Sequence, residues 1–165
     1  MEPMDFSIFP AEKDALYALL QKQLTSLVEG ERNAVANMAN ASALLGMALA
    51  QINWVGFYIL REKELVLGPF QGKPACIRIP VGRGVCGTAA QAGQTQLVPD
   101  VHAFPGHIAC DAASRSEIVV PLFAGQRLVG VLDIDSPVLA RFDTADKQGL
   151  EVFAAALADG CDWGE

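Results

Sequence analysis

Basic residues are scarce in this sequence, and that scarcity excludes two classes of partner. The 165 residues include 12 lysine and arginine residues against 19 acidic ones, which gives a net charge of -7. The bases are scattered along the chain and form no basic run. Because affinity for nucleic acid depends mainly on neutralising phosphates, we expect no nucleic-acid partner. An anionic membrane surface is disfavoured for the same electrostatic reason.

The sequence also lacks a secretory signal and an apolar run that could span a membrane. Residues 1–10 carry two acids and no base, which is the wrong charge for a signal peptide. No charged residue lies between Arg32 and Arg61, but several amide side chains in that stretch would be unpaired in lipid. We therefore expect a buried helix followed by a buried strand, in a cytoplasmic protein. We expect one polar stripe of the helix to face water or another subunit, namely Asn33, Asn37 and Asn40.

The sequence has four cysteines but no C-x-x-C pair, the spacing that is typical of zinc ribbons and thioredoxin-type redox motifs. Permanent structural disulfides are rare in the cytoplasm, so we do not expect these residues to act as staples. Reactive thiols are the remaining interpretation. The cysteines are Cys76, Cys86, Cys110 and Cys161.

The order of the expected elements predicts the α+β class. Apolar residues make up 52% of the chain, which is enough for a core in one domain over residues 1–165. Two helices come first, within residues 1–50, followed by strands within residues 53–135 and a helix at residues 143–158. Because helices and strands do not alternate, we expect a mainly antiparallel central sheet flanked by helices. Strands are expected at residues 54–60, 65–67, 76–80, 95–98, 117–123 and 127–135, and a short helix at 85–91.

A long loop, expected at residues 99–115, holds both histidines and one cysteine. Loops of this length in a compact domain are usually functional. An imidazolium at His102 or His107 would favour the thiolate of Cys110, the reactive form of cysteine. A surface loop with an incidental cysteine is the alternative. The H-x4-H-x2-C spacing is not a standard zinc pattern, so we expect no metal.

Acidic residues gather at one end of the last expected hairpin. Side chains alternate along a strand, so Asp133 and Asp135 project from one face together with Val129 and Val131. Glu117 begins the partner strand, and antiparallel pairing brings it near one of the two aspartates. Carboxylates crowded into a cleft repel one another, which favours either an ammonium site or a carboxyl group that keeps its proton. A solvated strand end is the alternative.

Two aromatic residues of the first expected strand, Trp54 and Tyr58, share one face of that strand. They could form the wall of a small pocket beside the acids. Packing in the core is the default for aromatic residues in such a strand, and both interpretations stay open.

Four segments of the sequence resemble those of one family. They read NWVGFY at residues 53–58, GRGVCGTAA at 82–90, HAFPGHIACD at 102–111 and GVLDIDS at 130–136. The layout from Trp54 onward resembles a GAF domain, and within GAF domains these segments are similar to those of the free methionine-(R)-sulfoxide reductases. The segment at 102–111 is the most specific, because GAF domains in general do not carry it.

The resemblance implies a fold, an activity and a set of site residues. The implied fold is a single GAF-like domain with an antiparallel sheet of about six strands, assembled as a homodimer. The implied reaction reduces free L-methionine-(R)-sulfoxide to L-methionine through a sulfenic acid on Cys110 and an intramolecular disulfide, with thioredoxin as reductant and no cofactor or metal. Cys76 is implied as the resolving thiol and Cys86 as an alternative. The residues implied to line the substrate pocket are Trp54, Tyr58, Glu117, Asp133 and Asp135.

A small-molecule sensor or other binding module is the competing interpretation, since GAF domains also serve that purpose. Sensors normally need an output domain, and we expect none in 165 residues that one domain fills. We therefore expect an oxidoreductase.

Overall fold

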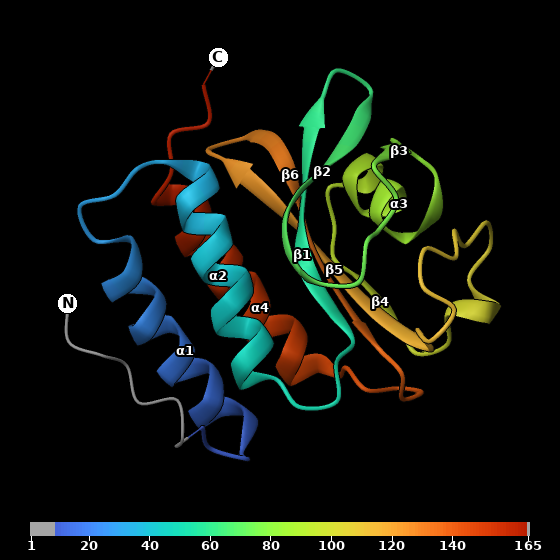
Figure 1. The fold of residues 1–165 in the computed structure, drawn as a ribbon, viewed down its shortest axis with the longest axis horizontal. Coiled ribbons are helices and arrows are strands. Elements are labelled where there is room, and N and C mark those ends of the chain that lie inside the picture. Colours follow the sequence, from blue (N-terminus) through green and yellow to red (C-terminus); the bar gives the residue numbers. More distant parts are fainter. Residues whose placement is uncertain (1–8, 165) are drawn as a thin grey trace.

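The computed structural model describes residues 9–164 (Figure 1). Residues 1–8 and 165 lie outside the described residues, and with them most of the segment on which the signal-peptide argument depends. Within the described residues, no helix is long and apolar enough to cross a membrane. The elements are α1 (Lys13–Val28), α2 (Ala34–Ala48), β1 (Trp54–Arg61), β2 (Glu64–Gly72), β3 (Arg78–Pro80), α3 (Gly84–Ala92), β4 (Gln96–Val98), a 3₁₀ turn (Val101–Ala103), β5 (Ser116–Ala124), β6 (Arg127–Ser136) and α4 (Thr144–Asp159).

The six strands form one antiparallel sheet in the order β3-β2-β1-β6-β5-β4. Two hairpins, β1–β2 and β5–β6, meet at the centre, where β1 pairs with β6. This central pairing places Gly56 directly opposite Asp133. The predicted α+β class, with an antiparallel sheet flanked by helices, is confirmed.

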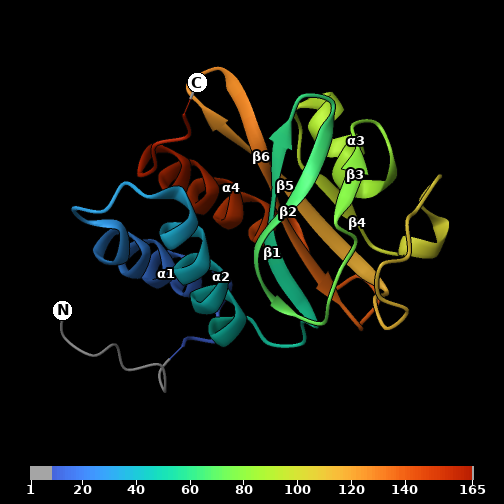
Figure 2. The same ribbon diagram turned by 45° about the horizontal axis from the view of Figure 1, so that its top comes forward.

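The two faces of the sheet are covered differently (Figures 1 and 2). Helices α1, α2 and α4 cover one face, where the larger core includes Leu24, Leu45 and Phe153. Helix α3 and the loop between β4 and β5 cover the other face, where a smaller core includes Tyr58 and Val131. Because side chains alternate along β1 and β6, each of these strands contributes to both cores.

One residue of β6 departs from the predicted alternation. Leu122 of β5 pairs with Gly130, and Phe123 pairs with Leu128, so that Val129 is an extra residue between two pairs. Val129 therefore joins the helix-side core while Leu128 packs against the smaller core. The prediction that Val129 shares a face with the aspartates is wrong, because a β-bulge shifts the pattern near the hairpin turn.

Asn37 of α2 is buried, with 2% of its surface exposed. Its Nδ2 donates hydrogen bonds to the backbone carbonyls of Glu31 (2.9 Å) and Gly160 (3.2 Å). The prediction that the asparagine stripe faces water or another subunit is wrong for this residue. Asn37 instead links the start of α2 to the end of α4, and so helps to hold the helical layer together.

Candidate active site

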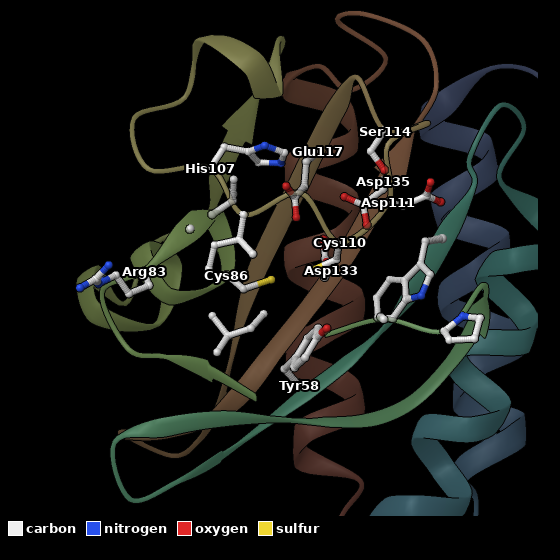
Figure 3. A pocket seen from close by; sticks show the side chains of 17 residues that line it. Tyr58, Arg83, Cys86, His107, Cys110, Asp111, Ser114, Glu117, Asp133 and Asp135 are labelled. Carbon is white, nitrogen blue, oxygen red and sulfur yellow. The ribbon is translucent and has the colours of Figure 1, made fainter. Parts of the chain in front are cut away.

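A small cavity lies on the α3 side of the sheet (Figure 3). Its volume is about 40 Å³, and 17 residues line it. They come from β1, the loop between β2 and β3, strand β3, the start of α3, the loop before β5, and strands β5 and β6. The fold therefore brings together segments that are distant in the sequence, including most of the expected site residues.

Three carboxyl groups line this cavity from two neighbouring strands. Glu117 of β5 lies directly opposite Asp135 of β6. Asp133 is two residues earlier on β6 and therefore lies on the same face. Glu117 and Asp133 are each 6% exposed, and Asp135 is partly exposed. The structure thus shows the predicted convergence, and a solvated strand end does not describe Glu117 or Asp133.

Burial raises the pKa of all three carboxyl groups. Desolvation, followed by the charges of the two aspartates, raises the pKa of Glu117 well above its ordinary value. Desolvation and the charge of Asp133 do the same to the pKa of Asp135. Desolvation also raises the pKa of Asp133, but hydrogen bonds from Glu117, Cys86 and Asp135 limit the rise. The pKa of Asp133 is therefore raised less than those of Glu117 and Asp135, and the cluster as a whole keeps protons above the ordinary carboxyl pKa.

An aromatic wall closes one side of the cavity. The ring of Trp54 stacks on that of Phe70 at 5.2 Å between centroids and lies 6.0 Å from that of Tyr58. Trp54 Nε1 donates to the carbonyl of Lys73 (3.1 Å), and the Tyr58 hydroxyl donates to the carbonyl of Cys76 (2.8 Å). The polar ends of both rings thus fix the loop between β2 and β3, while Trp54 and Tyr58 line the cavity.

Two of the four cysteines are joined at this wall. Cys76 and Cys110 form a disulfide, with their Cα atoms 5.7 Å apart. Cys86, in the first turn of α3, is a buried free thiol that also lines the cavity. Burial, followed by the charge of Asp133, raises the pKa of Cys86 well above its ordinary value, so its thiol stays protonated. Cys161 is a buried free thiol in the helix-side core, away from the cavity.

The histidines give less support to Cys110 than the sequence suggested. His107 lines the cavity, and its ring centroid lies 6.4 Å from that of His102. Burial, followed by the charge of His102, lowers the pKa of His107. An imidazolium at His107 that would favour a Cys110 thiolate is therefore disfavoured. Because Cys110 is in the disulfide, the H-x4-H-x2-C pattern does not form a ligand set in this state.

One group of side chains has the spacing of a metal site. Ligand atoms of Cys86, Glu117 and Asp133 lie within 4.8 Å of one another. Zinc accepts such a set of one sulfur and two carboxylate oxygens. Binding, however, would remove the protons that burial holds on Cys86 and Glu117. We interpret the group as a proton-sharing cluster and assign it no metal.

Sequence reasoning missed the residue that fixes the loop around Cys110. Asn53 Nδ2 donates to Asp111 Oδ2 (3.0 Å) and to Ser114 Oγ (3.1 Å). Asp111 also accepts the backbone N–H of Ala113 (2.9 Å), and this bond lowers its pKa. The Asp111-x-Ala113 turn could be suspected from sequence as an Asx turn. The role of Asn53 could not, because 58 residues separate it from Asp111.

Sequence reasoning also missed the contribution of α3. Arg83 and Gly84 line the cavity at the start of this helix. The first N–H groups of a helix have no partner within it and carry partial positive charge. No side chain caps them here. The sequence signal that could have indicated this anion-binding helix start is the Gly82-Arg83-Gly84 run just before a short helical pattern.

A family model, sequence relatives and solved structures all match this chain. The family model of the GAF domain matches residues 16–159. A protein of Escherichia coli (strain K12) named free methionine-R-sulfoxide reductase is 57% identical over 145 residues, which are 88% of this chain and 88% of that protein. The structure of free methionine-R-sulfoxide reductase from Neisseria meningitidis in complex with its substrate has a TM-score of 0.91 at 49% identity, covering 97% of this chain and 95% of that one.

The chain belongs to the GAF-domain family of free methionine-R-sulfoxide reductases. A third relative, the fRMsr of Staphylococcus aureus in complex with substrate, has a TM-score of 0.84 at 56% identity and covers 87% of this chain and 94% of that one. The family resemblance of the four sequence segments is thereby confirmed. The range matched by the GAF domain, 16–159, contains every carboxyl group and thiol of the cavity.

The raised carboxyl pKa values of this family member predict a pH dependence of its stability. An acid whose pKa is higher in the folded state binds more protons there than in the unfolded chain. The free energy of unfolding should therefore fall as the pH rises from about 4, the ordinary carboxyl pKa, towards the raised value. Asp135→Asn should remove part of this fall and raise stability at neutral pH, as measured by urea unfolding at a series of pH values.

Asp143→Asn is the control with the opposite sign. The ion pair with Lys13 (2.9 Å) lowers the pKa of Asp143 to about 2. Its stabilising contribution is present above the unfolded pKa and is lost as the pH falls towards about 2. This variant should change only the acid limb. An Asp135→Asn protein with the wild-type slope near neutral pH would show that Asp135 is ordinarily ionised.

Proposed function

We propose that the protein reduces free L-methionine-(R)-sulfoxide to L-methionine, with Cys110 as the nucleophile. One observation carries this proposal: the Cys76–Cys110 disulfide lies at the wall of a cavity that holds three carboxyl groups. A pair of thiols supplies two electrons, and buried acids supply protons. The relatives from Escherichia coli and Neisseria meningitidis bear the name of this activity.

The chemistry needs both kinds of group at once. In the proposed reaction, Cys110 Sγ attacks the sulfoxide sulfur while a protonated carboxyl group donates a proton to the oxygen. The oxygen then passes to Cys110, which becomes a sulfenic acid, and methionine leaves. Cys76 attacks Cys110 Sγ, the hydroxyl leaves as water, and the disulfide forms. The sulfoxide gains two electrons, and the two thiols lose them.

The different acids suit different tasks. The pKa of Asp133 is raised less than those of the other two acids, and its buried Oδ1 has no hydrogen-bond partner among the described residues. A buried carboxylate oxygen without a donor is costly, so an incoming ammonium group would be bound strongly there. Glu117 and Asp135 keep protons to higher pH, which suits a proton donor. We assign Asp133 to the substrate ammonium and either Glu117 or Asp135 to proton donation.

The opposite side of the cavity suits the substrate carboxylate. The start of α3 brings free N–H groups and the Arg83 side chain to the cavity, and both favour an anion. Backbone N–H groups of the loop at 99–115 are further candidates. Trp54 and Tyr58 provide the apolar surface for the side chain of methionine. An enclosed site for both charged ends would exclude a methionine sulfoxide within a peptide chain.

The thiol cycle has one resolving residue and one external reductant. Cys76 is proposed as the resolving thiol because it is within bonding distance of Cys110, whereas Cys86 is a protonated thiol deep in the acid cluster. Thiol–disulfide exchange with a dithiol, for which we propose thioredoxin, restores both thiols. A homodimer in the cytoplasm stays a prediction from the family.

A GAF sensor is the alternative function. A sensor would bind its ligand in the same cavity without changing it, and its thiols would stay in one oxidation state. The presence of two cysteines joined at the cavity wall favours the enzyme over the sensor.

Turnover of the separate sulfoxide epimers tests the proposal. With a small dithiol as reductant, the purified protein should reduce free methionine-(R)-sulfoxide and leave the S epimer largely unchanged, as followed by chromatography of the methionine formed. Equal rates for both epimers, a preference for sulfoxide in peptides, or binding without turnover would each contradict it.

Cysteine variants provide matched controls for the same assay. Cys110→Ser should abolish reduction, because no other group makes the first attack. Cys76→Ser should still form about one methionine per chain in a single turnover and then stop with thioredoxin. Cys161→Ser should keep wild-type activity, because this thiol is in the other core.

Amide variants of the acids test how the tasks are divided. Asp133→Asn should mainly raise the Michaelis constant, because it removes the charge that binds the ammonium group. Replacement of the proton donor, by Glu117→Gln or Asp135→Asn, should mainly lower kcat by ~10²- to 10⁴-fold and remove the alkaline limb of the pH–rate profile. If all three variants kept wild-type kinetics, the mechanism would have no proton source.

A further inference from the structure

An exposed apolar side chain lies beside the disulfide. Ile77 directly follows Cys76 and is 68% exposed, the largest exposed fraction among the large apolar side chains of the described residues. Ile108, two residues before Cys110, is 37% exposed. Each half of the disulfide therefore has an exposed isoleucine within two residues in the sequence.

The fold itself does not use the side chain of Ile77. Its backbone carbonyl accepts a hydrogen bond from the N–H of Leu67 (2.9 Å), which holds the chain beside β2. Neither hydrophobic core of the described residues includes Ile77. Complete burial of an isoleucine side chain is worth ~1.5–3 kcal/mol, so a partner that covers this residue would gain affinity.

The segment of chain around Cys76 differs in charge from the whole protein. No acidic residue occurs between Leu65 and Pro99, whereas Lys73, Arg78 and Arg83 lie in that stretch and are all exposed. The remainder of the chain carries the excess of acid that gives a net charge of -7. Two acids also face these bases. Glu64 forms an ion pair with Arg78 at 3.0 Å. The charge of Lys73 contributes to lowering the pKa of Asp111, so these two side chains also lie near each other.

We propose that Ile77, Ile108 and the basic side chains around them form the docking surface for a protein dithiol, an acidic reductant of the thioredoxin type. The proposal rests on the proposed function, because only a redox cycle requires such a partner to reach this disulfide. An apolar centre with a charged rim is the usual composition of a protein interface. A partner seated on Ile77 would place its reactive thiol next to Cys76.

The location of the surface also selects the sulfur that is attacked. Cys110 lines the cavity, whereas Cys76 does not and is followed by the exposed Ile77. A thiolate of the partner attacks Cys76 Sγ, the bond to Cys110 breaks, and Cys110 leaves as a thiolate that takes up a proton. The second thiol of the partner then attacks the mixed disulfide and releases Cys76. Two electrons pass from the partner's dithiol to the Cys76–Cys110 pair.

Reduction of the disulfide itself, without substrate, tests the docking surface. Oxidised Ile77→Ser is mixed with reduced thioredoxin or with a small dithiol, and free thiols are counted over time. The second-order rate constant with thioredoxin should fall about tenfold, the factor that corresponds to losing part of an isoleucine's burial. The rate with the small dithiol should be unchanged, and Ile77→Leu should restore the thioredoxin rate.

Val152→Ser is the matched control. Val152 lies on α4, is 58% exposed and is remote from the disulfide, so this variant should react as the wild type does. A thioredoxin variant with only its attacking cysteine should be trapped on Cys76, as mapped by mass spectrometry. Raised salt should slow the thioredoxin reaction, and a rate that is independent of salt would exclude the charged rim.

Several results would overturn the proposal. An unchanged thioredoxin rate in Ile77→Ser, or an equal loss with the small dithiol, would show that Ile77 does not bind the partner. A change of oligomeric state in Ile77→Ser would show that Ile77 contacts a second copy instead. Because this assay uses no sulfoxide, a protein that is reduced as expected but turns over no methionine sulfoxide would contradict the proposed function alone.

Discussion

Glu117, Asp133 and Asp135 share one small cavity, and their mutual repulsion governs the rest of the site. In a medium of low dielectric constant, three ionised carboxylates at such close range would be very unfavourable. The cluster must therefore keep protons or take up a cation. The raised pKa values of the three acids mean that, without a bound cation, the cluster keeps protons. A zwitterionic sulfoxide offers both at once, because its ammonium group is a cation and its oxygen accepts a proton.

The sheet makes this crowding unavoidable. Direct pairing of Glu117 with Asp135, and alternation along β6, place the three side chains on one face. Gly56 of β1 lies opposite Asp133 and has no side chain, and a Cβ atom there would collide with Phe70. The helix-side core anchors both central strands from the other face. The energy of that core thus supports an arrangement of charges that would not form by itself.

The two segments that carry the thiols are each tied to β1 or to the residue before it. Trp54 and Tyr58 hold the loop that contains Cys76, and Asn53 holds the loop that contains Cys110. Three of six consecutive residues therefore fix both halves of the disulfide relative to the acids. The NWVGFY segment, one of the four that carry the family resemblance, thus positions the disulfide although it contains neither a thiol nor an acid.

Strand periodicity predicted the core of the site from the sequence, because side-chain alternation and hairpin pairing are local rules. Asp133, Asp135 and their approach to Glu117 followed from these rules alone. The β-bulge at Val129 was missed because it depends on the pairing near one turn. The burial of Asn37 and the hydrogen bonds of Asn53 were missed because their partners are distant in the sequence. The pairing of Cys76 with Cys110 came only from the family resemblance, since no spacing rule indicates it.

Infrared difference spectroscopy of the carboxyl groups tests the central claim most directly, because protonated and ionised carboxyl groups absorb at different frequencies. The free enzyme at neutral pH should show the band of a buried protonated carboxyl group. That band should weaken in the Glu117→Gln and Asp135→Asn variants, each of which removes one of the two groups with strongly raised pKa, and should remain in Asp133→Asn. Its absence from the wild-type protein, or its presence unchanged in all three variants, would show that the cluster holds no proton and would contradict this account of the site.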